Sequence, residues 1–99
     1  MTANITWQSS SRQGTTQTVA YTASSATVTN AFGAQTRQIR LSSTTACHYK
    51  VVEAAGGAAA VTDSLLPINW VEYLTVTPGQ KISAIQDTAG GTLSVTEML

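Results

Sequence analysis

The chain has 99 residues, a length that suits one domain, and its five Lys and Arg residues balance five Asp and Glu residues. Zero net charge and a charged fraction of 10%, against about 25% in ordinary globular chains, exclude the clustered cations by which proteins bind nucleic acid or an anionic membrane. A small domain buries a limited part of its surface, and a neutral surface resists self-association poorly. The composition therefore predicts a chain that works in an assembly, as a homo-oligomer.

The first 16 residues are predicted to form an N-terminal arm. They are polar, and after Met1 their only large apolar side chains are Ile5 and Trp7. Aromatic residues are enriched where proteins meet, so Trp7 is a candidate contact with a neighbouring subunit; the alternative is that it folds back on its own domain. The segment lacks the apolar stretch of a signal peptide, which indicates a protein made in a cytosol.

From residue 17 to residue 99, short β-like runs alternate with turn signals. The chain contains 17 Thr and 10 Ser, and β-branched Thr suits a pleated, half-exposed surface. No stretch shows a 3.6-residue apolar period, so we expect an all-β protein: one small β-sandwich of about eight short antiparallel strands, with jelly-roll and immunoglobulin-like topologies both open. The predicted runs are 17–22, 25–30, 31–35, 36–43, 45–53, 70–76, 81–86 and 92–98.

The loops are marked by Gly and Pro. Residues 54–60, with the sequence AAGGAAA, combine helix-favouring Ala with Gly56 and Gly57, and predict a mobile hairpin loop. Pro78 and Gly79 predict a tight turn, because Pro sets φ and Gly supplies a positive φ. In the run 31–35, Gly33 indicates a turn or a bulge.

The predicted strand 70–76 has two apolar faces. Trp70 and Leu74 share one face, and Val71 and Tyr73 share the other. A strand with one wet side should alternate between apolar and polar residues, so this strand is predicted to be covered twice. A contact with another subunit, a central position in the sandwich under a bulge, and a ligand groove lined by Trp70 and Tyr73 are the three interpretations.

No group of residues predicts catalysis, a cofactor or a metal ion. Cys47 and His48 are neighbours on a predicted strand, so they point to opposite faces and cannot easily serve one metal or one nucleophile–base pair. The five acids are scattered singly, and the Gly-rich pieces lack a phosphate-binding pattern. Arg37 and Arg40 are predicted to form a solvated edge or an ion pair with Glu72 or Asp63, and an anion site is the alternative. We therefore expect a protein that is not an enzyme.

Three stretches carry a family resemblance: AFGAQTRQIRLSSTTACHYKV, LPINWVEYLTVTPGQKISAI and GGTLSVTEM. They combine an aromatic-Gly-x-Gln-Thr-Arg opening before an Ile-Arg-Leu strand, a Cys-His strand, a Leu-Pro and aromatic-rich strand, Pro-Gly-Gln-Lys, and a terminal Leu-x-Val-Thr-Glu strand. Over residues 31–98 this cadence resembles small virion proteins of tailed bacteriophages, of the capsid decoration or cement type. The resemblance implies a compact β-sandwich, often trimeric, on the outer shell, and it carries no list of functional residues.

These observations predict a structural virion protein that binds and stabilises a phage capsid. We expect it to be made in the host cytoplasm and to lie on the capsid surface. Its expected partners are the major capsid protein, other virion proteins and further copies of itself, with no nucleic acid and no membrane. The alternatives are a small tail, neck or fibre component, or a carbohydrate-binding module. The predicted partner contacts are Trp7, Phe32, Arg37, Arg40, Trp70 and Tyr73, with the two Arg residues as a polar rim.

Overall fold

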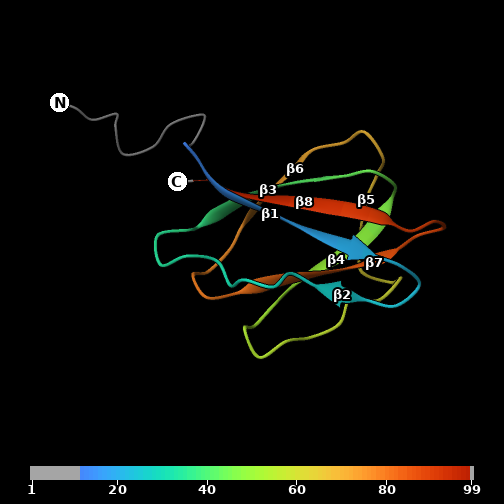
Figure 1. Ribbon diagram of the computed structural model, residues 1–99, viewed down its shortest axis with the longest axis horizontal. Helices are drawn as coiled ribbons and strands as arrows, with labels where there is room; N and C mark the ends of the chain where they lie inside the picture. The colour runs from blue at the N-terminus through green and yellow to red at the C-terminus, as the bar shows by residue number, and fades with distance from the viewer. Residues whose placement is uncertain (1–11, 99) are drawn as a thin grey trace.

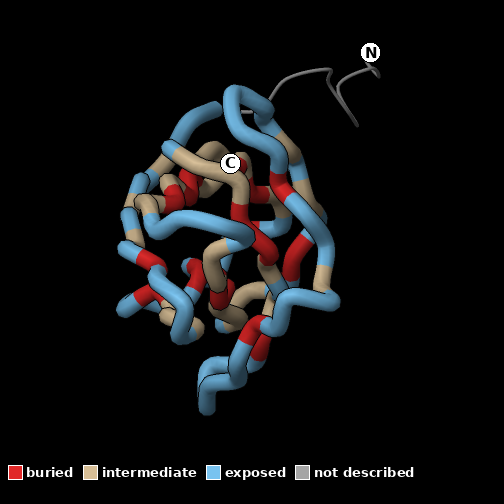
Figure 2. Tube along the Cα trace, turned by 90° about the vertical axis from the view of Figure 1, so that its right-hand side faces the viewer, coloured by how far each residue is buried: buried red, intermediate tan, exposed pale blue. Residues whose placement is uncertain are grey.

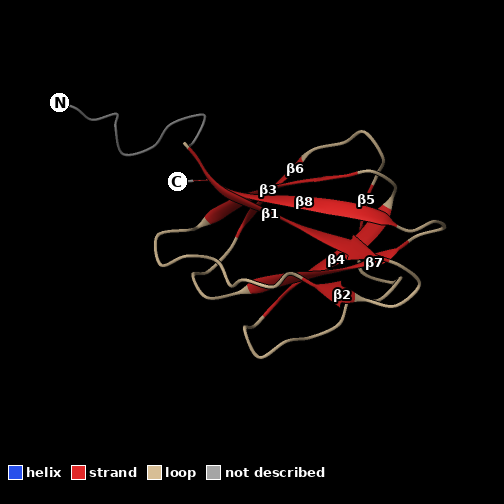
Figure 3. Cartoon of the chain, in the orientation of Figure 1, coloured by secondary structure: helices blue, strands red, loops and turns tan. Residues whose placement is uncertain are grey.

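The computed structural model describes residues 12–98, and this part of the chain is all-β, as predicted (Figure 3). Eight strands form two antiparallel sheets of four strands each. The strands are β1 (Gln13–Tyr21), β2 (Ala26–Thr27), β3 (Gln38–Ser43), β4 (Cys47–Val52), β5 (Ser64–Leu66), β6 (Glu72–Thr75), β7 (Lys81–Gln86) and β8 (Gly91–Met98).

The two sheets stack as the layers of a sandwich (Figure 1). Sheet A has the order β1-β8-β3-β6 and sheet B the order β2-β7-β4-β5. Every connection except β4–β5 therefore crosses from one sheet to the other. This interleaved order is that of an eight-stranded jelly roll, which decides between the two topologies that the sequence left open. Because β1 packs against β2 and β7, the edge of sheet A formed by β1 lies over the edge of sheet B formed by β2. β6 and β5 form the opposite edges of the two sheets.

The core lies between the sheets and follows the alternation predicted from the sequence. On β3, Ile39 and Leu41 are fully buried while Arg40 points outward. Figure 2 shows the exposed residues along the outer turns and loops. The buried core comprises Tyr21, Val28, Phe32, Ile39, Leu41, Cys47, Leu66, Val76, Ile82, Ala84, Leu93 and Val95.

Two boundaries differ from the prediction. β1 begins at Gln13, inside the segment assigned to the arm of residues 1–16, and Gln13 pairs with Met98 of the last strand. Residues 31–35 form a turn rather than a strand, while the three-residue β5 had not been singled out. Residues 1–11 and 99 lie outside the described residues.

Residues 53–63, which we call the flap, are tied to the outer face of sheet B by hydrogen bonds at Gly57 and Ala59. The carbonyl oxygen of Gly57 accepts hydrogen bonds from the hydroxyls of Ser83 at 2.9 Å and Thr27 at 3.3 Å. The N–H of Ala59 donates to Oγ of Ser25 at 2.9 Å. Sequence alone gave no sign of this docking, because the Ala and Gly residues contribute backbone groups and the matching hydroxyls come from distant strands.

One of the resemblance motifs, AFGAQTR, is fastened to the terminal strand by Glu97. The Glu97 carboxylate accepts a hydrogen bond from the N–H of Gly33 at 3.0 Å and another from the hydroxyl of Thr36, which is fully buried. This motif therefore has a structural role: it closes one end of the sandwich.

The Pro78-Gly79 turn is confirmed, and it joins the same end. Gly79 has φ of 89°, a left-handed conformation that Gly adopts at little cost. Its N–H donates to the carbonyl oxygen of Phe32 at 2.9 Å, and the N–H of Phe32 donates to the carbonyl oxygen of Gln80 at 2.8 Å. These bonds hold the backbone on both sides of the buried Phe32 ring.

Candidate partner-binding surface

The exposed large apolar side chains of residues 12–98 lie in one segment, 61–73. This segment runs from the end of the flap through β5 and the following connection into β6. Single apolar residues scattered on a surface are ordinary, whereas several exposed large apolar side chains in one short segment suggest an interaction surface. We call this group the apolar edge; its members are Val61, Leu65, Ile68, Trp70, Val71 and Tyr73.

The apolar edge coincides with the free edges of both sheets. β5 ends sheet B and β6 ends sheet A on the same side of the sandwich, and no other strand of residues 12–98 pairs with their outer sides. An unpaired strand edge can accept a further chain through its backbone groups. The surface thus combines apolar side chains with backbone available for pairing.

The turn before β6 projects Trp70 outward. Asn69 has φ of 62°, in the left-handed region where Asn is tolerated better than most residues. The indole Nε1–H of Trp70 donates to Oε2 of Glu72 at 3.1 Å, while 57% of Trp70 remains exposed. A ring already held in the free protein loses less conformational entropy on binding, so Trp70 is suited to be an anchor.

Tyr73 continues the surface onto the outer face of sheet A. It lies opposite Arg40 on β3, and Arg40 lies opposite Thr96 on β8. The alternate residue Leu74 packs on the core, whereas Tyr73 is 54% exposed. Because β6 is an edge strand, the interpretation of 70–76 as a central strand is wrong. The strand begins at Glu72, so Trp70 does not follow the strand parity assumed from the sequence.

The six predicted contact residues fall into four groups. Trp70 and Tyr73 belong to the apolar edge. Arg40 and Arg37 lie beside β6: Arg40 is paired with Tyr73, and the carbonyl oxygen of Arg37 accepts a hydrogen bond from the N–H of Val76 at 2.9 Å. Trp7 lies outside the described residues.

Phe32 forms the fourth group, because it is only 3% exposed. Its ring lies in the core and cannot be a surface contact, so we remove it from the proposed contact surface. Conversely, the sequence analysis missed Val61, Leu65 and Ile68. A signal for them exists in the apolar density of residues 65–71, but density alone does not distinguish an exposed segment from a buried one.

Charged groups take little part in the apolar edge. Among residues 12–98 the only ion pair joins His48 and Asp87, so the predicted pairing of Arg37 or Arg40 with a carboxylate is not formed. The same residues contain no group of three or more His, Cys, Asp or Glu side chains placed to hold a metal ion. They also contain no helix long and apolar enough to cross a membrane.

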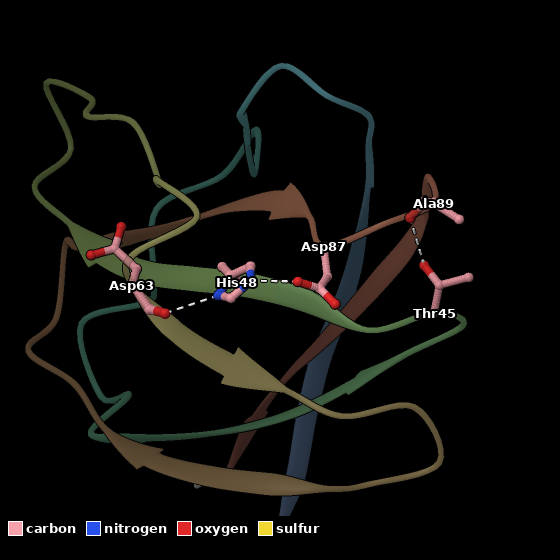
Figure 4. Close-up of polar contacts among 5 residues, drawn as sticks. All are labelled: Thr45, His48, Asp63, Asp87 and Ala89. Atoms are coloured by element: carbon pink, nitrogen blue, oxygen red, sulfur yellow. Dashed lines mark hydrogen bonds and ion pairs between the residues drawn. The ribbon is translucent and has the colours of Figure 1, made fainter.

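His48 lies on the outer face of β4 and links two loops (Figure 4). Its Nδ1 is 2.9 Å from the carbonyl oxygen of Asp63, and its Nε2 is 2.9 Å from Oδ1 of Asp87. The hydrogen bond to the Asp63 backbone, followed by that to the Asp87 side chain, raises the pKa of His48 above its ordinary value and outweighs the opposing effect of burial. Cys47 faces the core on the opposite side, as predicted, and burial raises the pKa of its thiol.

Fold and surface define the class of this protein: a small jelly-roll β-sandwich whose apolar edge is exposed. No family model matches the chain, and no curated protein and no solved structure matches it.

Proposed function

We propose that this chain is a structural virion protein, a cement or decoration subunit that binds and stabilises a phage capsid. The observation that supports the proposal most is the apolar edge, with six large apolar side chains exposed in one segment along two free strand edges. The family resemblance of residues 31–98 supplies the kind of partner.

The energetics of such a surface suit attachment to a shell. Burying apolar area contributes about 25 cal/mol per Å², and few charges need to be desolvated at the apolar edge. A subunit that binds only the assembled shell stabilises the shell by mass action. If several copies associate, as a trimer in the favoured arrangement, later contacts form at high effective concentration and strengthen attachment.

The proposal gives the residues distinct roles. Trp70, held by Glu72, is the anchor of the contact, and Tyr73 extends it across β6. Arg37 and Arg40 form the polar rim beside them. Trp7, from the segment that precedes β1, is a further aromatic contact.

Sedimentation with phage particles that have been depleted of this protein tests the proposal. We expect wild-type chain to rebind, and Trp70→Ala to bind at least about tenfold more weakly, as expected when a central aromatic contact is truncated. Thr18→Ala is the matched control, because Thr18 is exposed on β1 at the opposite edge. Rebinding of Trp70→Ala at wild-type strength contradicts the proposal, as does a wild-type chain that does not rebind.

A tail, neck or fibre role is the first alternative, and stoichiometry distinguishes it. A cement subunit is present in proportion to the major capsid protein, whereas a tail or neck component is limited to the few copies of one ring or fibre. Quantitative mass spectrometry of purified particles measures this ratio directly.

A carbohydrate-binding module is the second alternative, favoured by the exposure of both Trp70 and Tyr73. Aromatic rings on a surface can stack against the apolar faces of sugars. Titration with oligosaccharides would then quench the fluorescence of Trp70, and the quenching would be lost in Trp70→Ala. A flat titration across a panel of oligosaccharides removes this alternative.

A further inference from the structure

His48 fastens the flap at the point where the apolar edge begins (Figure 4). Asp63, whose carbonyl oxygen contacts Nδ1, stands in the chain between Val61 and Leu65. The turn 60–63 is closed by its own bonds: the Asp63 N–H donates to the Ala60 carbonyl oxygen at 2.9 Å, and the Ala60 N–H donates to Oδ2 of Asp63 at 2.7 Å. The turn is therefore a small unit, fixed before it by the bond from Ala59 to Ser25 and after it by the pairing of β5 with β4. Between these two points His48 supplies its contact with the sheet beneath.

The two partners of His48 both accept hydrogen bonds. A carbonyl oxygen and an ionised carboxylate have no proton to donate, so both ring nitrogens of His48 must donate if both contacts are to be made. Imidazolium donates from both nitrogens, whereas neutral imidazole donates from one. Neutral His48 would place a nitrogen lone pair 2.9 Å from one of the two oxygens, so one contact must lengthen on deprotonation.

The contact with Asp63 is the one expected to open. A hydrogen bond to a carboxylate is stronger than one to a neutral carbonyl group, so the neutral tautomer keeps its proton on Nε2, facing Asp87. The flap stays fixed upstream, where Gly57 is bound to Ser83 and Ala59 to Ser25. Opening is thereby confined to the turn 60–63, which carries the exposed Val61.

We propose that His48 is a pH-sensitive latch on the apolar edge. Protonated, it holds the turn 60–63 against sheet B and keeps Val61 in place beside Leu65; neutral, it releases the turn and disrupts that end of the apolar edge. The regulatory part of the proposal rests on the proposed function, since it concerns the same surface. The latch itself is a property of the free protein.

The surroundings of His48 define the direction of the pH effect. The ionisable groups that face it are Asp63 from the flap and Asp87 from the loop after β7, while its cross-strand neighbours, Leu65 on β5 and Ile85 on β7, do not titrate. The pKa of His48 is raised from 6.5. The latch is therefore closed when the pH lies well below the pKa of folded His48, and it opens as the pH rises through that pKa.

The test uses the free full-length chain. NMR follows the titration of the His48 ring and, at each pH, the protection of the amide hydrogens of residues 60–63 relative to an unstructured chain. We expect protection across residues 60–63 to fall with the same midpoint as the ring titration, because the turn's own hydrogen bonds open more readily once the turn is no longer held against the sheet. Asp87→Asn, which keeps an acceptor oxygen but removes the charge, should lower that midpoint. Lys81→Gln, which removes one charge from β7 away from the latch, should leave it close to the wild-type value.

Two results would overturn the latch: amide protection of residues 60–63 that stays constant while the His48 ring titrates, or the wild-type pH response persisting in His48→Gln. Particle binding measured on both sides of the midpoint then tests regulation. Weaker binding above the midpoint supports it, and equal binding with the latch open contradicts it. Absence of binding at both pH values counts against the proposed function, and the NMR result still decides the latch.

Discussion

Phe32 and Trp70 both lie in connections between strands, but one side chain is buried and the other is exposed. Phe32 is 3% exposed, with its backbone bonded to Gly79 and Gln80 on either side. Trp70 is 57% exposed, with its indole held by Glu72. Both residues are aromatic, and both were proposed as partner contacts.

The difference in burial depends on where each connection runs relative to the two sheets. The Phe32 loop runs between β2 and β3, crosses one end of the sandwich and closes it, so its ring enters the core. The Trp70 connection runs between β5 and β6, along the side where both sheets end, so no described strand covers it. An aromatic side chain in a loop is thus a core residue or a surface anchor according to topology, and the following predictions test that contrast.

Truncating the two aromatic rings should separate them most clearly. Phe32→Ala leaves a cavity in the core and should lower the free energy of unfolding by about 3–5 kcal/mol. Trp70→Ala removes an exposed ring and should change it by less than about 1 kcal/mol. Urea unfolding monitored by circular dichroism measures both values. Equal destabilisation by the two substitutions would mean that Trp70 belongs to the core.

The two carboxylates that support these regions provide a matched pair. Glu97→Ala leaves the N–H of Gly33 and the buried hydroxyl of Thr36 without their acceptor, at a cost of about 1–3 kcal/mol in stability. Glu72→Ala frees an exposed indole N–H that water can satisfy, so stability should change by about 0.5 kcal/mol or less. Thermal unfolding of the two variants compares them, and a larger loss in Glu72→Ala would reverse the assignment.

The two residues with left-handed backbone should differ in the same sense. Gly79→Ala places a Cβ on a backbone with φ of 89°, and this conformational strain alone should cost about 1–2 kcal/mol, because the added Cβ would meet no atom within 4 Å. Asn69→Gly, at φ of 62°, relieves a milder strain and should be within about 0.5 kcal/mol of the wild type. Chemical denaturation gives both numbers; strong destabilisation by Asn69→Gly would show that the Asn69 side chain has a role of its own.

The smallest expected effect is the dependence of stability on pH. Because the pKa of His48 is raised in the folded chain, its contribution to the free energy of unfolding is complete below pH 6.5 and declines as the pH rises through the folded-state pKa. Urea midpoints measured from pH 5.5 to pH 9 should show this decline in the wild type and not in His48→Gln. An unchanged decline in the variant would assign it to another group.

Local patterns predicted the faces of the strands but not their neighbours. The two-residue period of a strand correctly placed Cys47 and His48 on opposite faces, because that inference needs no knowledge of the neighbouring strands. The edge position of β6 depends on pairing between distant segments, which a single sequence does not display. The three-residue β5 is too short to show a period at all.

The candidate site was predictable to the same degree. Trp70 and Tyr73 were identified from an apolar-rich run, which is a local signal. The partners of His48 were not, since Asp63 and Asp87 lie 15 and 39 residues further along the chain. Phe32 was misassigned because aromatic character alone does not distinguish a ring that closes a sandwich from one that projects from it.

A hydrogen-exchange footprint on the particle tests the central claim most directly. The full-length chain is compared free and bound to depleted phage particles, and protection is mapped along the sequence. Our account predicts the largest gain in protection within residues 61–73, with little change over residues 17–21 of β1 on the opposite edge. Bound chain whose residues 61–73 exchange as fast as in the free protein, while another surface becomes protected, would contradict it.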